Sequence, residues 1–253
     1  MSQSLAIDMR KVNPTGLTQL DRDVHNGSVA SRKRLIVPPQ VEYVALIGDI
    51  VNSRGIRDRA KSQKDLIHLL SGLNKLHKDQ LTSLFTITSG DEFQALFEDP
   101  SVIPELLVKL ERGFVHSRIR FGIGKGVLST KLEHSSIGMD GPAWHLAREA
   151  IQAAKAQGQL GGVYLGFGDP DDQVLNAISS QAEWYRGRYY ERYSDIFLLL
   201  EEGLAQIDIS ARLKKKKQQV SEQIARSGWR HYWKGQMALK AVLSRHQTQG
   251  PSA

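Results

Sequence analysis

The chain of 253 residues contains no cysteine, which excludes disulfide bonds and thiolate metal ligands. It also lacks any apolar run approaching the ~20 residues that a transmembrane helix needs. Its first residues do not show the basic and then apolar layout of a secretory signal. These absences predict a cytoplasmic protein with no membrane partner.

Acidic residues are scarce in one part of the chain. Residues 206–245 hold ten Lys or Arg against two Asp or Glu, a net charge of +8. The whole chain carries +7, so the remaining residues are close to neutral. Because the positive charge is confined to one segment, it predicts a polyanionic partner for that segment alone.

Hydrophobic periodicity is missing from residues 1–40, which contain turn signals such as Asn13-Pro14 and Asn26-Gly27. We expect a flexible leader in this range. Residues 41–172 alternate strand-like and helix-like patterns, which predicts an α+β domain. Residues 173–253 are rich in helix formers and basic residues, which predicts a second, small all-α domain.

Asp49 lies in a nearly continuous apolar run, residues 43–51, of the kind typical of a strand buried on both faces. A carboxylate in such a run costs free energy unless it is paired, hydrogen-bonded or bound to a metal ion. The sequence therefore predicts a partner for Asp49.

Two further carboxylates, Asp91 and Glu92, follow Gly90 between strand-like runs at 84–87 and 93–97. The Gly-Asp pair suits a two-residue hairpin loop in which Gly takes the position that needs positive φ. Both carboxylates then lie at the tip of a hairpin. Taken alone, the same pattern also fits a solvated acidic turn.

A helical pattern over residues 66–76 separates the strand of Asp49 from the hairpin. A right-handed crossover would bring the end of that strand close to the hairpin tip. Asp49, Asp91 and Glu92 would then form an oxygen cluster suited to Mg²⁺ or Mn²⁺, with substrate phosphates bound to the ion.

The nucleotide-binding residues that we predict lie in loops and strands around this cluster. A polar loop that precedes a helix can hold phosphates with its free backbone N–H groups, although it also fits an ordinary strand-to-helix turn. Glycines within the strand pattern at 119–127 indicate that another group approaches the backbone closely, and a base or ribose is one candidate. The predicted set is Asn52, Ser53, Arg54, Gly90, Gly122 and Gly124.

The order of these motifs resembles that of class III nucleotide cyclases: Asp49-Ile50-Val51, then the Gly-Asp hairpin, then Arg120–Val127. Ser89-Gly90-Asp91-Glu92-Phe93 also resembles the signature of diguanylate cyclases, which share that catalytic fold. Taken with the C-terminal end, residues 43–245 resemble the SatD family of bacterial proteins. The resemblance implies a ferredoxin-like, nucleotide-cyclase-like palm domain that binds a nucleotide with a divalent ion.

The helix expected after Gly141 departs from the cyclase pattern. Active cyclases carry an Asn and, four positions later, an Arg that stabilises charge on the transferring phosphate. Here those positions hold His145 and Glu149, and Arg148 is one residue away, which is a rotation of ~100° on a helix. This departure from the pattern argues against an active cyclase, so we assign no catalytic residues and expect cyclase turnover to be absent or far below that of an active member.

Residues 206–224 fit a helix-turn-helix, with a support helix expected at 196–203. The apolar residues that would pack between the two helices are Ile209, Leu213, Val220 and Ile224. Lys214 falls at the left-handed turn position, which Gly usually occupies and where another residue costs ~1–2 kcal/mol. A solvated helical pair used for dimerisation is the alternative.

The helix-turn-helix hypothesis predicts two kinds of contact with double-stranded DNA. The four lysines of the turn would contact phosphates, and the polar residues of the second helix would read base edges in the major groove. The predicted DNA-binding residues are Lys214, Lys215, Lys216, Lys217, Gln218, Gln219, Glu222, Gln223 and Arg226. Such proteins commonly bind as homodimers, which we expect here.

Three functional hypotheses follow from the sequence. The first is a DNA-binding transcriptional regulator whose degenerate cyclase-like domain senses a nucleotide with Mg²⁺. The second is an enzyme, either a metal-dependent nucleotide cyclase or a nucleotidyltransferase. The third is a non-catalytic scaffold in which Asp49 and Asp91 serve only structure.

Overall fold

A computed structural model describes residues 41–248, without the side chains of residues 190 and 191. The predicted leader, residues 1–40, lies outside the described residues. The first part of the fold contains, in chain order, β1 (Glu42–Ile50), α1 (Arg59–Leu76), β2 (Ser83–Ser89), β3 (Glu92–Phe97), α2 (Ile103–Gly113), β4 (Ile119–Val127), α3 (Pro142–Gln157) and β5 (Gly161–Leu165). The helices α4 (Asp171–Glu201), α5 (Gln206–Arg212), α6 (Lys217–Arg226) and α7 (Trp229–Ser244) follow.

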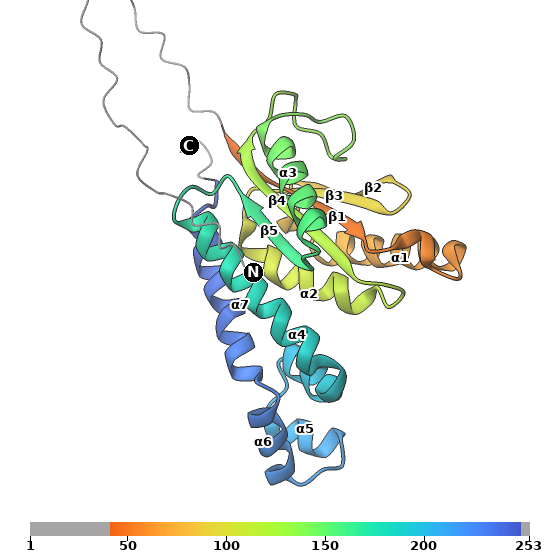
Figure 1. Ribbon diagram of the computed structural model, residues 1–253, viewed down its shortest axis with the longest axis vertical. Coiled ribbons are helices and arrows are strands. Elements are labelled where there is room, and N and C mark those ends of the chain that lie inside the picture. Colours follow the sequence, from red (N-terminus) through yellow and green to blue (C-terminus); the bar gives the residue numbers. More distant parts are fainter. Residues whose placement is uncertain (1–40, 249–253) are drawn as a thin grey trace, which may run out of the picture. The chain divides into compact units, whose positions relative to one another are not determined.

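The strands form one five-stranded sheet in the order β2-β3-β1-β4-β5 (Figure 1). Strand β1 is antiparallel to both β3 and β4, whereas β5 is parallel to β4. The chain order βαββαβ, with β1 between β3 and β4, is that of a ferredoxin-like fold. The predicted α+β class is therefore confirmed, with α3 and β5 as additions to the ferredoxin-like unit.

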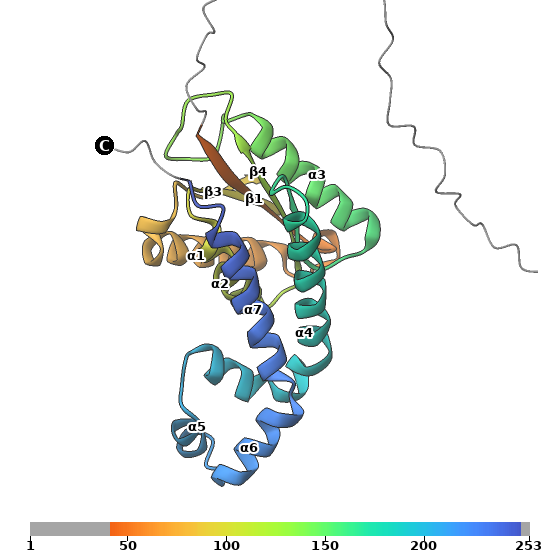
Figure 2. The same cartoon turned by 90° about the vertical axis from the view of Figure 1, so that its left-hand side faces the viewer.

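Helices cover both faces of the sheet (Figures 1 and 2). On β1, Val44 and Leu46 join the core with α1 and α2, whereas Ala45 and Ile47 join the core under α3. This two-sided burial explains why the sequence of β1 is almost continuously apolar.

Helices α4 and α7 lead away from the sheet to α5 and α6 (Figures 1 and 2). Leu175 of α4 and Leu239 of α7 belong to the core of the sheet. Phe197 of α4 and Trp229 of α7 belong to a second core, which they share with Ile209 and other residues of α5 and α6. We call the residues from Ala182 to Tyr232 the helical arm.

The described residues, 41–248, lie within one compact unit. The predicted division into two domains at residue 172 stays a prediction. It falls at the start of α4, and α4 is a helix that contributes to both cores. Between residues 41 and 248, no helix is both long and apolar enough to cross a membrane.

Candidate functional site

The end of β1 lies beside the tip of the β2–β3 hairpin, as the crossover argument predicts. Gly90 has φ 47° in a two-residue loop, and Asp49 faces Glu92 in the β1–β3 register. The backbone N–H of Ile50 donates to the carbonyl oxygen of Asp91 at 3.2 Å. Asp49, Asp91 and Glu92 are therefore neighbours along the backbone.

Two basic residues of α3 neutralise two of these carboxylates. The Asp49 Oδ1 atom lies 2.9 Å from the Nζ atom of Lys155. The Arg148 guanidinium donates to both oxygens of Glu92, with Nη2–Oε1 at 2.8 Å. These hydrogen bonds raise the pKa of Arg148. Asp49 thus has the partner that its burial requires.

Asp91 contacts a different set of residues. It accepts a hydrogen bond from the Ser53 hydroxyl and, with Gly90 and Arg59, lines a cleft of about 330 Å³. Within residues 41–248, no group of three or more His, Cys, Asp or Glu residues could hold a metal ion. In this arrangement the carboxylates do not fit a shared Mg²⁺ or Mn²⁺ ion, and such an ion stays a prediction.

The loop after β1 has the local structure expected of a helix start. Asp58 caps α1, and its Oδ1 atom accepts the Lys61 backbone N–H at 2.9 Å. Asn52 has φ 50°, and Ser53 begins a short 3-10 helix that ends at Gly55.

Clefts lie on the surface around this loop. Asn52 and Lys61 line one of about 470 Å³, and Ser53 lines the one that contains Asp91. Arg54 is exposed and lines neither.

The glycines of β4 serve helix packing. A Cβ atom at Gly122 would lie 2.2 Å from the carbonyl oxygen of Ala147, and one at Gly124 would lie 2.1 Å from the Ala147 nitrogen. The group that approaches β4 closely is therefore the backbone of α3. Gly122 and Gly124 do not fit a nucleotide-binding role, because α3 fills the space where a base or ribose was expected.

Sequence reasoning missed the roles of Arg148 and Lys155. These residues are seven apart, two helical turns, and so lie on one face of α3. Arg148, which the cyclase pattern placed one residue out of position, binds the hairpin carboxylate. Glu149 is exposed, and His145 pairs with Asp140 at 2.8 Å.

At the end of the helical arm, α5 and α6 are joined by a turn at residues 213–216. Lys214 has φ 51°, the left-handed conformation predicted for it. Ile209, Val220 and Ile224 are buried between the helices and the rest of the arm. The Ser210 hydroxyl donates to the carbonyl oxygen of Lys215 at 2.6 Å, which ties α5 to the turn.

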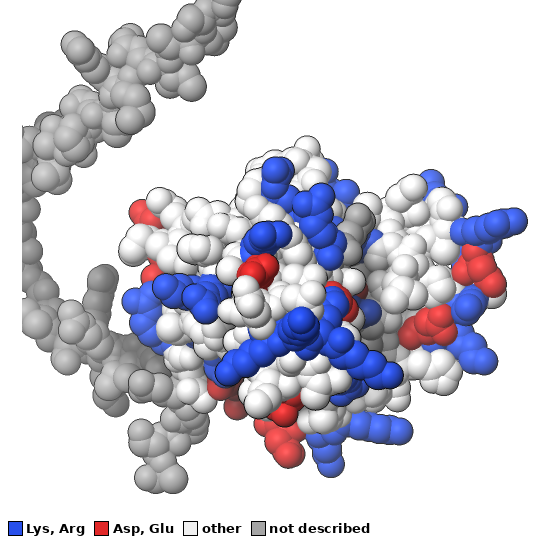
Figure 3. All heavy atoms as spheres, turned by 90° about the horizontal axis from the view of Figure 1, so that it is seen from below, with Lys and Arg blue, Asp and Glu red and all other residues white. Residues whose placement is uncertain are grey.

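Seven of the nine predicted DNA-binding residues are exposed, namely Lys214, Lys216, Lys217, Gln218, Gln219, Glu222 and Arg226. The other two are half-buried and bind within the protein. The Lys215 Nζ atom lies 2.9 Å from Asp195 and 3.2 Å from Gln223. Figure 3 views the molecule from this end and shows Lys and Arg side chains spread over the face.

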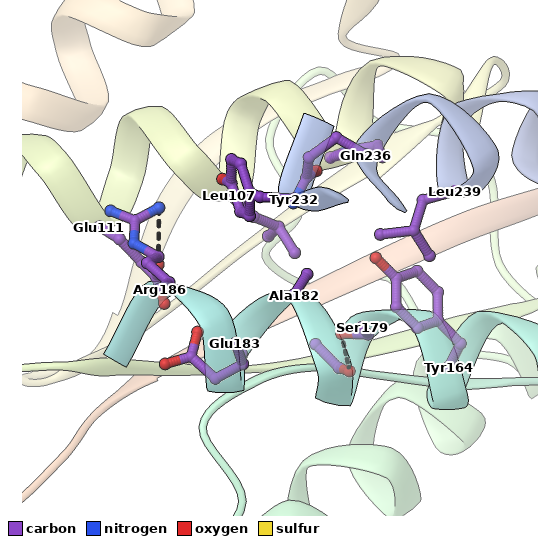
Figure 4. Close-up of a pocket in the computed structure, with 13 residues that line it drawn as sticks. Leu107, Glu111, Tyr164, Ser179, Ala182, Glu183, Arg186, Tyr232, Gln236 and Leu239 are labelled. Carbon is purple, nitrogen blue, oxygen red and sulfur yellow. Dashed lines mark hydrogen bonds and ion pairs between the residues drawn. The ribbon is translucent and has the colours of Figure 1, made fainter. Parts of the chain in front are cut away.

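A buried polar cluster lies between α2, β5, α4 and α7 (Figure 4). Glu111 pairs with Arg186 at 3.0 Å, and both side chains are more than nine-tenths buried. Burial raises the pKa of Glu111 to about 7, despite the neighbouring guanidinium. Glu183 pairs with Arg118 beside them.

This cluster borders a cavity of about 40 Å³. The Tyr164 hydroxyl faces the cavity and has no hydrogen-bond partner within the described residues. Sequence patterns do not reveal such a cluster, because Glu111 and Arg186 are far apart in the chain and each looks like an ordinary helical charge.

These features define a class of protein: a ferredoxin-like α+β unit with an ion-paired hairpin site and a basic helical arm. The sequence matches the SatD family over residues 43–246, so the chain belongs to the SatD family. No curated protein matches the chain.

Solved structures share parts of the fold at low identity. The guanylyl cyclase Cya2 is 13% identical, with TM-score 0.34 over 44% of this chain and 70% of its own. A bacterial light-regulated adenylyl cyclase is 15% identical, with TM-score 0.35 over 47% of this chain and 72% of its own. A regulator of polyketide synthase expression from Bifidobacterium adolescentis is 13% identical, with TM-score 0.24 over 80% of this chain and 86% of its own.

Proposed function

We propose that the protein is a DNA-binding transcriptional regulator in which α5 and α6 form a helix-turn-helix. The observation that carries this proposal is the turn at Lys214, whose φ of 51° sets α6 across α5 with its polar side exposed. A four-residue turn between two short helices that share a core is the arrangement of such motifs.

Three lysines would contact the phosphate backbone in this proposal. Lys214 and Lys216 lie in the turn and Lys217 begins α6, and all three are exposed. Positive charge at this position supplies affinity that does not depend on base sequence.

One row of α6 is suited to base reading. Gln218, Glu222 and Arg226 follow one another at intervals of four residues, so they lie on one side of the helix, and all are exposed. Gln pairs with adenine, Glu accepts from cytosine and Arg pairs with guanine in the major groove. Gln219 instead caps α6, because its Oε1 atom accepts the Lys216 backbone N–H at 2.9 Å.

The hairpin end of the sheet is proposed as the sensor. The clefts near Asn52, Ser53 and Gly90 are bordered by Arg59 and Lys61, which suit the phosphates of a nucleotide. A divalent ion would supply charge neutralisation to those phosphates, but Asp49 or Glu92 would first have to leave its basic partner on α3.

Selection of preferred duplexes from a random pool tests the DNA proposal. We expect a preferred sequence with two half-sites about one helical turn, ~10 bp, apart, because one motif per chain is commonly used as a dimer. A pool that returns no preferred sequence would contradict it.

The ion pair between Asp49 and Lys155 favours a second candidate, a scaffold in which Asp49 has only a structural role. Incubation with each nucleoside triphosphate and Mg²⁺ or Mn²⁺ separates the possibilities. A thermal shift without product indicates a sensor, product indicates an enzyme, and neither indicates a scaffold.

A further inference from the structure

A partly exposed aromatic cluster lies on the helical arm where α4 meets the start of α7. The aromatic patch consists of Trp184, Tyr185, Arg188, Tyr189 and His231. Trp184 is 56% exposed, although a large apolar side chain gains free energy from burial. Tyr185 and Tyr189 are half-buried and pack against the core of the helical arm, whereas Trp184 belongs to none of the cores. The proposed helix-turn-helix does not use the patch.

The rings of the patch form a connected series. Tyr185 stacks on Tyr189 with centroids 5.9 Å apart, and on His231 at 6.3 Å with an interplanar angle of 12°. Trp184 packs edge-on against Tyr185 at 5.3 Å. The Arg188 guanidinium lies 5.3 Å from the centre of the Trp184 ring, a cation–π contact.

The charged side chains that α7 contributes around the patch are all basic. No Asp or Glu follows Glu222 in the sequence, so α7 carries no carboxylate. Its exposed cations near the patch are Arg230 and Lys234, and α4 adds Arg188. An anionic partner therefore fits this surface.

We propose that the aromatic patch binds unpaired nucleobases of a single-stranded nucleic acid. Bases present π-faces that stack on exposed aromatic rings, and the neighbouring cations neutralise the phosphates between them. In duplex DNA the base faces are already stacked inside the helix, so the patch would select strands that are unpaired.

A second copy of the chain fits this surface poorly. Two copies of the same face would bring Arg188, Arg230 and Lys234 against the same residues, and such like-charge contacts are unfavourable. The proposal does not rest on duplex binding by α5 and α6, because different residues make the two contacts.

Fluorescence anisotropy with labelled oligothymidine and oligouridine of about 12 nucleotides tests the proposal on the full chain. We expect Trp184→Ala to weaken binding about 5- to 150-fold, the range for losing one base stack. Trp184→Phe should restore most of the affinity, because it keeps an aromatic face. A third oligonucleotide, which keeps the phosphates but lacks the bases, should bind wild type at least as weakly as oligothymidine binds Trp184→Ala, because it loses every base stack.

Val115→Ala serves as the matched control, since Val115 is 82% exposed and lies outside the patch. Melting curves establish that each variant is folded, and duplex binding should change less than twofold in Trp184→Ala. Equal binding of oligothymidine by wild type and Trp184→Ala would overturn the proposal. Binding to anionic vesicles or self-association through Trp184, without oligonucleotide binding, would also overturn it.

Discussion

Glu111 is a buried carboxylate, and its burial costs free energy because the charged group loses its water. Burial raises its pKa to about 7, and the Arg186 guanidinium offsets this only in part. The folded state therefore binds a proton at pH values where an unfolded Glu, with a pKa near 4.3, has lost it. By linkage, Glu111 lowers the free energy of unfolding as pH rises from about 4.3 to about 7.

Replacement of Glu111 by Gln should flatten this part of the pH profile. Gln keeps the shape of the side chain but cannot ionise, so the decline attributed to Glu111 should disappear between about pH 4.3 and pH 7. Urea unfolding at a series of pH values measures it. Glu133→Gln, at an exposed glutamate, should follow wild type, and a Glu111→Gln profile parallel to wild type would refute the assignment.

The Asp49–Lys155 ion pair should contribute more than a surface pair. The Asp49 side chain is 13% exposed, so removal of Lys155 leaves a poorly hydrated carboxylate. We expect Lys155→Met to lower the free energy of unfolding by about 1–3 kcal/mol, and Asp49→Asn to cost less. The double variant should show a coupling energy that exceeds the ~0.5 kcal/mol of an exposed helix pair.

A double-mutant cycle in urea measures this coupling. The pair Glu105–Lys109, four residues apart on α2, supplies the reference cycle, because the Glu105 side chain is 54% exposed against 13% for Asp49. Equal coupling in the two cycles would mean that Asp49 is solvated and does not depend on Lys155. That result would favour the prediction that Asp49 binds a metal ion.

At the level of elements, β4 and α3 depend on each other. Gly122 and Gly124 are two residues apart on a strand and so face the same side, where the α3 backbone contacts the sheet. Side chains at these positions would separate α3 from the sheet and move Arg148 and Lys155 away from the hairpin.

We therefore expect Gly124→Ala to lower the free energy of unfolding by at least about 2 kcal/mol. The new Cβ would lie 2.1 Å from a backbone nitrogen, which cannot move without shifting the helix. Gly72→Ala is the matched control, because nothing lies within 4 Å of its Cβ and Ala favours a helix by about 1 kcal/mol. Denaturant unfolding compares them; a neutral Gly124→Ala would show that α3 packs less closely than the structure has it.

Local sequence patterns predicted most of these elements because their causes are local. The hairpin glycine Gly90 and the turn at Lys214 each depend on a few neighbouring residues, and each is found in the structure. The glycines of β4 indicated a close approach but not the group that makes it. That group, α3, follows β4 in the chain, and only its packing shows which face it covers.

Longer-range features were not predictable in the same way. The composition shift near residue 172 coincides with the start of α4, but it does not reveal that this helix packs into two cores. The Glu111–Arg186 pair joins α2 to α4 across many residues of sequence. A single sequence gives no signal for such pairs, because Glu and Arg are also common on the exposed faces of helices.

On the scale of the whole molecule, the arm places a basic surface on a chain that is otherwise nearly neutral. Figure 3 shows this surface from the α5–α6 end. If it binds duplex DNA, its affinity should depend on salt through the number of phosphates it neutralises. Exposed lysines should contribute to this salt dependence, whereas a lysine that bonds to other residues of the protein should not.

The last prediction compares these two kinds of lysine. Replacing Lys214, Lys216 and Lys217 by Ala should weaken binding to every duplex and reduce the salt slope by about 0.9 for each lost contact. Lys215→Ala should leave the slope near wild type and instead destabilise the arm, because Lys215 bonds to Asp195 and Gln223.

Anisotropy titrations at several salt concentrations, with melting curves for each variant, measure both effects. Gln218→Ala should differ from all the lysine variants, since it should lose about 1–3 kcal/mol on one preferred sequence and keep non-specific binding. If the triple lysine variant keeps the wild-type slope, the arm does not hold DNA by this turn. The positive charge of residues 206–245 then serves another anionic partner.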